Sequence, residues 1–332
     1  MLPLVVTMGE PAGIGGEITL KAWLGRGDGV PPFYLIDNPD RIAALARRLG
    51  WPVPVQPISA PEEAPAVFAE ALPIWPVGIT SQALPAHPDP ADAPAILSAI
   101  ETGVHHVRNG WAAALVTNPI HKDSLYRAGF RYPGHTEYLA SLAGVSEAPV
   151  MMLVCPVLRV VPVTIHLALR HAVLELRASA IVHVARVTDA ALRRDFGVAA
   201  PTLAIAGLNP HAGEGGGLGR EEIEIIEPAI AELRNGGIEA RGPLAADTMF
   251  HAEARRSYDA ALCMYHDQAL IPIKTIDFHG GVNVTLGLPF VRTSPDHGTA
   301  FAIAGRGVAR AESMIAALRL AADMAARRAV SG

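Results

Sequence analysis

The stretch MLPLVVTMGEPAGIGG, residues 1–16, indicates the fold class of this chain. Leu2–Met8 is an apolar run typical of a buried strand, and a glycine-rich loop after it leads into a helical pattern. The same succession recurs along the chain. Further strands are expected at Phe33–Asp37, Ala112–Thr117, Val150–Cys155, Leu158–Thr164, Thr202–Ala206 and Ala260–Met264. Amphipathic helices are expected at Ala95–Val107, Glu221–Asn235 and Glu312–Arg328. The alternation predicts an α/β protein with a largely parallel sheet.

Composition excludes several classes of protein. The chain has 332 residues, which favours two domains, and 50% hydrophobic but only 5% aromatic residues, which predicts an aliphatic core. Its net charge is -5 and no basic run occurs, so nucleic acid is not an expected partner. No apolar stretch reaches the roughly 18 residues of a membrane span. The apolar start lacks a basic region and is interpreted as a strand, not a signal peptide.

Cys155 and Cys263 lie in strand-like runs, which indicates a reduced, cytoplasmic protein. The proline-rich stretch Trp51–Pro94 is interpreted as surface loops and short edge strands.

Three histidines stand in similar settings, each at the end of a predicted strand: His166, His211 and His266. A single histidine at such a place more often has a structural, hydrogen-bonded role. Carboxyl ends of parallel strands meet at one edge of a sheet, where α/β proteins bind ligands. Three imidazoles that leave a coordination position open suit a catalytic divalent metal. Asp247 and Asp267 are candidates for orienting these ligands or for proton transfer.

The run CMYHDQALIPIK, Cys263–Lys274, is interpreted as a buried strand and the polar turn that leaves it. Lys274, Asn283 and Arg292 together suit a phosphate and a carboxylate, because a point charge, an amide and a forked guanidinium recognise such groups. For Arg292 a surface salt bridge is an equally good interpretation.

Two further motifs adjoin predicted strands or helices. In PGHTEYL, Thr136 could be an ordinary helix N-cap, which leaves His135 without a structural explanation. The loops Gly9–Gly15 and Asp296–Gly307 are rich in glycine and small residues, so a ligand could approach their backbones. For the first loop, a structural tight turn is at least as good an interpretation.

The order of nine motifs resembles that of the 4-hydroxythreonine-4-phosphate dehydrogenase family of vitamin B6 biosynthesis. They are GEPAGIG, TNPIHK, PGHTEYL, TIHLAL, GLNPHAGE, ADTMF, YHDQALIPIK, NVTLGLPFVRTS and DHGTAFAIAG. The last motif also resembles the nucleotide loop of the isocitrate and isopropylmalate dehydrogenases. The resemblance implies two α/β/α domains, residues 1–127 with 286–332 and residues 128–285, with the active site in a cleft between them. It further implies a homodimer with a shared active site, in which His266 reaches in from the partner chain.

The resemblance also assigns roles to residues. It implies metal ligands at His166, His211 and His266, with zinc, magnesium, manganese or cobalt as the metal. It implies substrate contacts at His135, Thr136, Lys274, Asn283 and Arg292. The cofactor would be NAD, with NADP as an alternative, bound by the loop residues His297, Gly298, Thr299, Ala300 and Ile303. Glu10, Gly16 and Ala302 depart from the family pattern, and Ala302 puts a contact to the adenosine ribose in doubt.

The reaction implied is the metal-dependent oxidation of 4-phosphohydroxy-L-threonine at C3 by NAD, followed by decarboxylation to 3-amino-2-oxopropyl phosphate. Asp247 and Lys274 are the candidates for proton transfer. The first alternative is the same chemistry on D-threonate or D-erythronate 4-phosphate, which carry a hydroxyl in place of the amine. The second is a metal-dependent binding protein without catalysis, for which Ala302 is the only hint.

Overall fold

The computed structural model describes residues 2–77 and 83–331, although not the side chain of residue 331. The chain divides into two compact units, Met1–Pro149 with Leu288–Ala326 and Val150–Gly287 with Arg327–Gly332. Residues 128–149 therefore fall in the first unit, whereas the resemblance implied a boundary after residue 127. They belong there because Tyr138 and Leu139 pack into the first unit's core.

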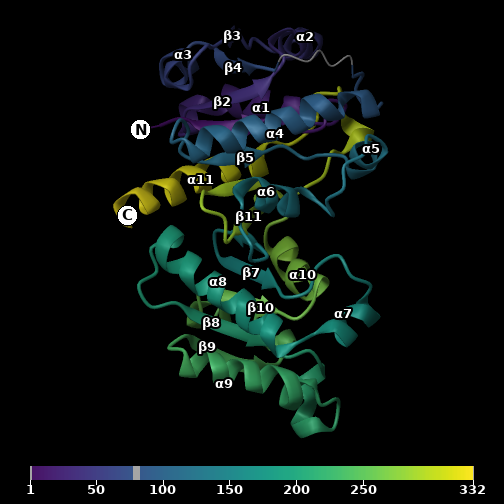
Figure 1. Cartoon of the computed structure of the whole chain (residues 1–332), viewed down its shortest axis with the longest axis vertical. Coiled ribbons are helices and arrows are strands. Elements are labelled where there is room, and N and C mark those ends of the chain that lie inside the picture. Colours follow the sequence, from purple (N-terminus) through teal and green to yellow (C-terminus); the bar gives the residue numbers. More distant parts are fainter. Residues whose placement is uncertain (1, 78–82, 332) are drawn as a thin grey trace. The chain divides into compact units, whose positions relative to one another are not determined.

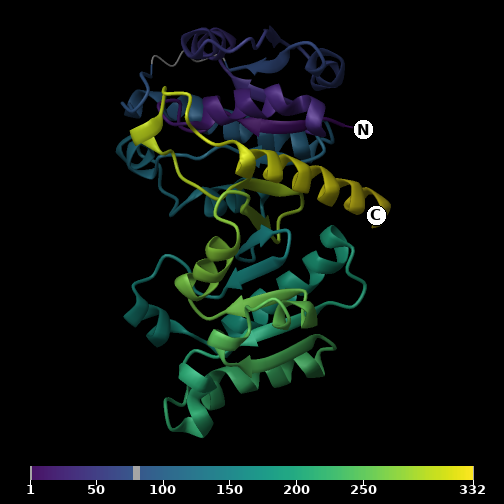
Figure 2. The ribbon, with the colours of Figure 1, turned by 180° about the vertical axis from the view of Figure 1, so that it is seen from behind.

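The first unit is a parallel sheet with helices on both faces. Its strands are β3 (Val55–Pro57), β4 (Leu72–Pro76), β2 (Phe33–Asp37), β1 (Leu4–Thr7), β5 (Leu115–Thr117) and β12 (Arg292–Pro295), in that spatial order. Helix α4 (Ala93–Arg108) covers one face, whereas α1 (Gly15–Leu24) and α11 (Glu312–Ser331) lie on the other (Figures 1 and 2). The remaining helices are α2 (Pro39–Leu49), α3 (Ala64–Phe68), α5 (Lys122–Arg127) and α6 (His135–Ala143). Parallel strands buried on both faces are apolar throughout, as in β1, whose four residues are all buried.

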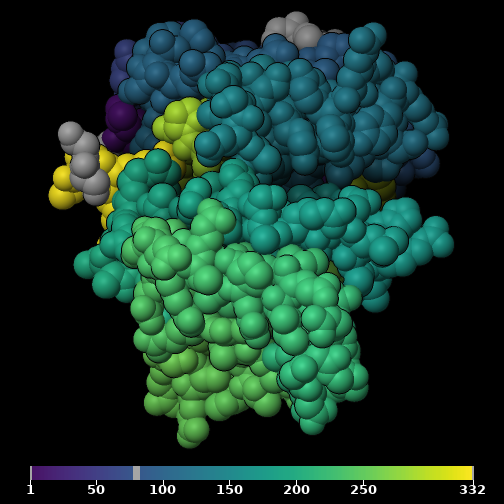
Figure 3. Space-filling model, turned by 60° about the horizontal axis from the view of Figure 1, so that its bottom comes forward, coloured from purple at the N-terminus to yellow at the C-terminus, as the bar shows by residue number. Residues whose placement is uncertain are grey.

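The second unit is a mixed sheet with the spatial order β11 (Val282–Leu286), β6 (Val150–Cys155), β7 (Leu158–Pro162), β10 (Ala260–Cys263), β8 (Thr202–Ala206) and β9 (Glu239–Leu244). Strands β7, β10, β8 and β9 run parallel, while β6 is antiparallel to both β7 and β11. Helix α8 (Ala178–Phe196) covers one face and α10 (His266–Ile276) the other (Figures 1 and 2). Helix α9 (Glu227–Asn235) packs on α8 and β9, and α7 (Leu169–Glu175) follows β7. The α9 end of this unit is turned forward in Figure 3, where the segment after β8 forms a continuous green surface.

The predicted α/β class with a largely parallel sheet is confirmed, and three strands have the predicted bounds: Phe33–Asp37, Val150–Cys155 and Thr202–Ala206. Two interpretations were wrong. Leu72–Pro76, placed among loops and edge strands, is an interior strand between β3 and β2, and Leu72 and Ile74 are fully buried. The residues after Tyr265 form helix α10 instead of a turn, even though Pro272 lies inside it. No helix in the described ranges is long and apolar enough to cross a membrane.

The cores are aliphatic, as the composition predicts. In the first unit, Val5, Ile36 and Leu115 of the sheet pack against Ile96 and Ile100 of α4. Each such side chain, when fully buried, contributes about 1.5–3 kcal/mol to folding. Rigid strands stabilised in this way hold the loops at their ends in place, and those loops carry the polar residues predicted to be functional.

Candidate active site

His166 and His266 come together in the second unit. His166 follows β7, and His266 is the first residue of α10 after β10, the strand that pairs with β7. Their ring centroids are 6.1 Å apart, and both line a cavity of about 220 Å³ with Thr164 and Tyr265. Asp267 holds Nδ1 of His266 at 2.7 Å, an interaction that orients an imidazole and leaves Nε2 for a ligand.

Backbone strain marks two of the three histidines. The φ angle is +53° at both His166 and His211, in the left-handed region that side chains other than glycine rarely adopt. Such residues persist where the surrounding structure enforces them, and they gather at functional sites. His211 begins a left-handed turn after β8, in the 3-10 segment η4 (Pro210–Gly216).

The donor set fits a divalent metal in its chemistry, because neutral imidazoles bind zinc, cobalt and related ions. Within residues 2–77 and 83–331, however, no group of three or more His, Cys, Asp or Glu side chains is arranged to hold a metal. One chain thus brings His166 and His266 together without a third ligand. The three-histidine site stays a prediction.

The other predicted residues of the second unit lie on α10, on β11 and beside them. Asp247, in the 3-10 turn η6 (Ala246–Thr248), and Asp267 line a cavity of about 410 Å³. Lys274 lies in the last turn of α10, with Nζ 5.5 Å from the ring centroid of Phe278. Asn283 is on β11, and its Oδ1 is buried without a hydrogen-bond partner among the described residues. A buried amide oxygen without a partner is costly, which suits a group that a ligand satisfies.

In the first unit, Arg292 is buried at the start of β12, with 3% of its surface exposed. Its Nε and Nη2 donate to Oγ1 of Thr117 at the end of the paired strand β5, at 3.2 and 2.6 Å. Burial lowers the pKa of Arg292 to about 10, so the guanidinium is still charged at neutral pH. The surface salt bridge considered for Arg292 is excluded, because the side chain is not at the surface. A charge held in this way suits an anionic ligand.

His135 and Thr136 open helix α6. Burial, then the charges of Arg292 and Lys122, hold the pKa of His135 well below its usual value, so its imidazole is neutral. Nε2 of His135 is buried and has no hydrogen-bond partner among the described residues. The predicted cap on Thr136 was wrong: the N-cap is Gly134, without a side-chain hydrogen bond. Lys122, the first residue of α5, is a further cation whose placement the sequence reasoning missed.

The predicted cofactor loop, His297–Ile303, packs against the first glycine-rich loop. The amide of Ile14 donates to the carbonyl of Thr299 at 3.1 Å, and a Cβ on Gly13 would lie 2.9 Å from that same oxygen. Ala300 has a φ of +45°. The end of the loop is fixed by Glu17 of α1, whose buried carboxylate accepts the amides of Gly305 and Gly307. Glu17 was missed because its partners lie far along the chain.

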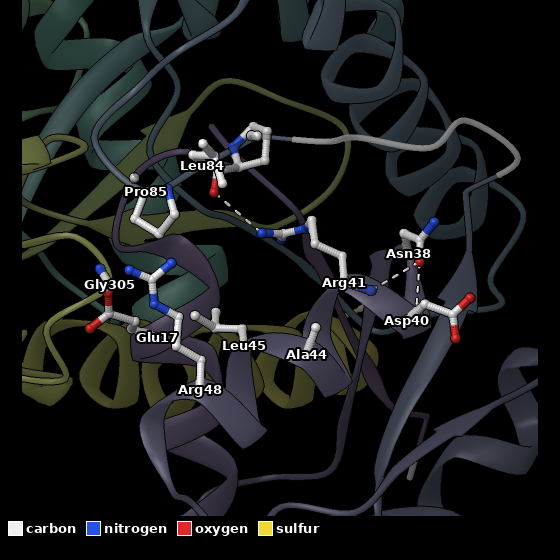
Figure 4. Close-up of a pocket in the computed structure, with 13 residues that line it drawn as sticks. Glu17, Asn38, Asp40, Arg41, Ala44, Leu45, Arg48, Leu84, Pro85 and Gly305 are labelled. Atoms are coloured by element: carbon white, nitrogen blue, oxygen red, sulfur yellow. Dashed lines mark hydrogen bonds between the residues drawn. The ribbon is translucent and has the colours of Figure 1, made fainter.

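A cavity of about 380 Å³ adjoins Gly305 at the end of this loop (Figure 4). The guanidinium of Arg48 points toward Gly305 and Pro85, while Arg41 reaches the carbonyl of Pro11 at 3.3 Å (Figure 4). Arg41 also forms an ion pair with the buried Asp37. A concave site with a few fixed polar groups beside a glycine-rich loop is typical of a cofactor pocket.

Comparison with known proteins identifies the family. A family model described as pyridoxal phosphate biosynthetic protein PdxA matches residues 31–321. The chain belongs to the PdxA family. It is 55% identical to a 4-hydroxythreonine-4-phosphate dehydrogenase of Bradyrhizobium diazoefficiens, with 98% of each chain covered. A crystal structure of 4-hydroxythreonine-4-phosphate dehydrogenase from Klebsiella pneumoniae superposes with a TM-score of 0.88 at 36% identity, covering 98% of this chain and all of that one.

Membership of the PdxA family confirms the resemblance and makes the chain a dehydrogenase. PdxA dehydrogenases use NAD and a divalent metal. A β-decarboxylating dehydrogenase from Thermococcus kodakarensis, at 12% identity and a TM-score of 0.50, with 100% of this chain and 88% of that one covered, shares the fold alone. That similarity supports the isocitrate dehydrogenase-like fold class.

Proposed function

We propose that this chain oxidises 4-phosphohydroxy-L-threonine at C3 with NAD and then decarboxylates the product, in pyridoxal 5'-phosphate biosynthesis. The substrate is named by the relatives, which match this chain over its full length. The structural observation that carries the proposal is the buried guanidinium of Arg292 beside the neutral imidazole of His135. Such a charge in a desolvated site suits a phosphate or carboxylate, both of which the substrate has.

The reaction consists of an oxidation at C3 followed by a decarboxylation. The proton of the C3 hydroxyl passes to a base and the C3 hydride passes to NAD, which leaves a β-keto acid. The acid loses CO2, and protonation at C2 gives 3-amino-2-oxopropyl phosphate. A divalent metal, when bound, supplies electrostatic stabilisation of negative charge on the substrate oxygens.

The protein's own residues bind and orient the substrate and transfer protons. Arg292, with His135 and Thr136, would hold one anionic group, and Lys274 with Asn283 would hold another. Asp247 and Lys274 are the proposed proton-transfer groups. The loop His297–Ile303, including Gly298, Thr299 and Ala300, would bind the cofactor through its backbone, with His166, His211 and His266 as the metal ligands.

We also propose a homodimer that shares its active sites, with His266 supplied by the second copy. Its support is the apolar side chains exposed around the paired histidines. Leu169 and Leu174 of α7 and Ile271 of α10 are 61%, 69% and 64% exposed. Apolar side chains grouped in this way favour an interface. A cytoplasmic location is proposed because both cysteines, Cys155 and Cys263, are free and buried.

The deciding experiment measures NADH and CO2 from 4-phosphohydroxy-L-threonine with chelated and metal-restored protein. Metal-dependent formation of both is expected. D-Threonate and D-erythronate 4-phosphate serve as matched controls, since a site that pairs an amine rejects the hydroxyl analogue strongly. Turnover of those compounds alone would move the protein to a sugar-acid substrate, and no NADH with any of them would contradict the proposal.

A further inference from the structure

The turn that carries His211 is held in an unusual conformation. Every residue from His211 to Gly216 has a positive φ, and three of them, His211, Ala212 and Glu214, are not glycine. Left-handed residues other than glycine occur as a rule singly, because Cβ crowds the following carbonyl oxygen. The amides of Ala212, Gly217 and Leu218 donate to the carbonyls of Asn209, Glu214 and Gly213 at 3.2, 3.3 and 3.1 Å. Residues in this conformation persist where the surrounding structure supports them.

Glu222 holds the segment that leads into the turn, together with Glu221, whose Oε2 accepts a hydrogen bond from Nδ2 of Asn209 at 2.7 Å. Glu222 is 2% exposed and is the first residue of η5 (Glu222–Ile226), a single turn of π-helix. Its Oε1 accepts the amides of Leu208 and Asn209 at 2.8 and 2.7 Å. Its Oε2 accepts Nδ2 of Asn209 at 2.9 Å. These three bonds fix Leu208 and Asn209, two of the three residues between β8 and the turn. A π-helical turn often marks a functional site.

Glycines make this close approach possible. A Cβ on Gly213 would lie 2.6 Å from Oε2 of Glu222, and one on Gly207 would lie 3.3 Å from Oε1. The carboxylate is thus packed against the backbone on both sides of His211. Gln268 anchors the start of the same segment, because its Nε2 donates to the carbonyl of Gly207 at 2.8 Å.

We propose that Glu222 is a positioning residue that sets the backbone of His211 for metal binding; this inference rests on the proposed metal site. The carboxylate accepts two backbone amides and one side-chain amide of the segment that leads to His211, so every bond it makes there is to an N–H donor. An amide in its place would keep the shape but direct one NH2 group at those donors. The turn would then relax, and the imidazole would leave the geometry that a metal requires.

The test uses Co²⁺ as the probe, since its visible spectrum reports ligand geometry. Glu222→Gln is expected to lower Co²⁺ affinity about 10–100-fold, the usual effect of losing a residue that orients a ligand. The visible spectrum of the Co²⁺ protein should change as well, while the thermal unfolding midpoint stays within a few degrees of wild type. Glu224→Gln is the matched control, because Glu224 lies in the same π-helical turn but is exposed and paired with Arg220. It should bind Co²⁺ like the wild type.

Co²⁺ binding by His211→Ala, measured in parallel, distinguishes failure of the positioning role of Glu222 from failure of the metal site itself. If His211→Ala loses Co²⁺ binding and Glu222→Gln keeps wild-type affinity and spectrum, the positioning role is wrong and the metal site stands. If His211→Ala itself binds Co²⁺ normally, the proposed three-histidine site fails, and with it the basis for this role. Should Glu222→Gln not fold, Glu222→Asp decides, since it keeps the carboxylate but withdraws it from the same amides: weakened binding supports the role, and unchanged binding overturns it.

Discussion

Arg292 donates from two nitrogens of its guanidinium to one neutral oxygen, Oγ1 of Thr117, across the paired strands β12 and β5. The hydroxyl fixes the plane of the guanidinium without neutralising its charge. A guanidinium held in a fixed plane is suited to the recognition of a phosphate or carboxylate. Thr117 therefore sets the orientation of the proposed substrate-binding cation.

Thr117→Val should raise KM for the phosphorylated substrate about tenfold, which corresponds to about 1.4 kcal/mol, because the guanidinium loses its alignment. Steady-state kinetics at saturating NAD would measure the change. The matched control is Thr293→Val on β12, whose buried hydroxyl donates instead to the carbonyl of Ala317. Thr293→Val should lower stability and leave KM unchanged; equal KM values for the two variants would contradict the role of Thr117.

Glu10→Gln should stabilise the protein at alkaline pH. Burial raises the pKa of Glu10 from its usual 4.5 to about 7, and its Oε2 has no hydrogen-bond partner among the described residues. Because the unfolded chain ionises more readily, stability falls as pH rises from 4.5 to 7 and then levels off. Removing the charge should raise the free energy of unfolding by up to about 3 kcal/mol at pH near 8.

Near pH 4, Glu10→Gln should have almost no effect, since the carboxyl is then protonated in both states. Urea unfolding at the two pH values measures the difference, with the exposed Glu62→Gln as control. A gain that is the same at both pH values would show that Glu10 is not the titrating group.

Glu17→Gln should weaken NAD binding about tenfold and leave kcat within about twofold, because one of the two loop amides loses its acceptor. The amides of Gly305 and Gly307 would then no longer share one carboxylate. Calorimetry with NAD and the KM for NAD report the loss. Glu70→Gln, at an exposed position, is the control. An unchanged KM for NAD would show that Glu17 does not contribute to cofactor binding.

His166→Ala should lower the affinity for a divalent metal about 100-fold or more, because a ligand itself is lost. His171→Ala on the neighbouring helix α7, where the side chain is exposed, should not. Elemental analysis of both variants after dialysis measures how much metal each retains. Equal metal content in the two variants would remove His166 from the ligand set.

Local pattern was sufficient for much of the fold. Apolar runs such as Val150–Cys155 predicted strands because a strand buried on both faces needs an apolar residue at every position. The same reasoning failed for Leu72–Pro76, where two prolines in five residues argued against an interior strand. It failed again at His266, because a helix that contains Pro272 and starts soon after a strand has weak local signals.

The candidate site was likewise predictable from the sequence only in part. Sequence position placed His166, His211 and His266 at strand ends, and in the structure each lies in the segment that follows a strand, His266 as the first residue of α10. The left-handed φ angles of His166 and His211 could not be predicted, since nothing in the local sequence demands them. They depend on packing, and the segment that leads to His211 donates two backbone amides to Glu222, which comes after the turn in the sequence.

By itself, the sequence determined most of the strands and helices and the polar residues that follow them, because both can be inferred from local periodicity. Tertiary structure decided which of those residues meet. Thr117 and Arg292 are 175 positions apart, and Glu17 lies 288 positions from Gly305. A buried donor or acceptor must find a partner wherever the packed chain brings one, and that partner is a property of the whole fold.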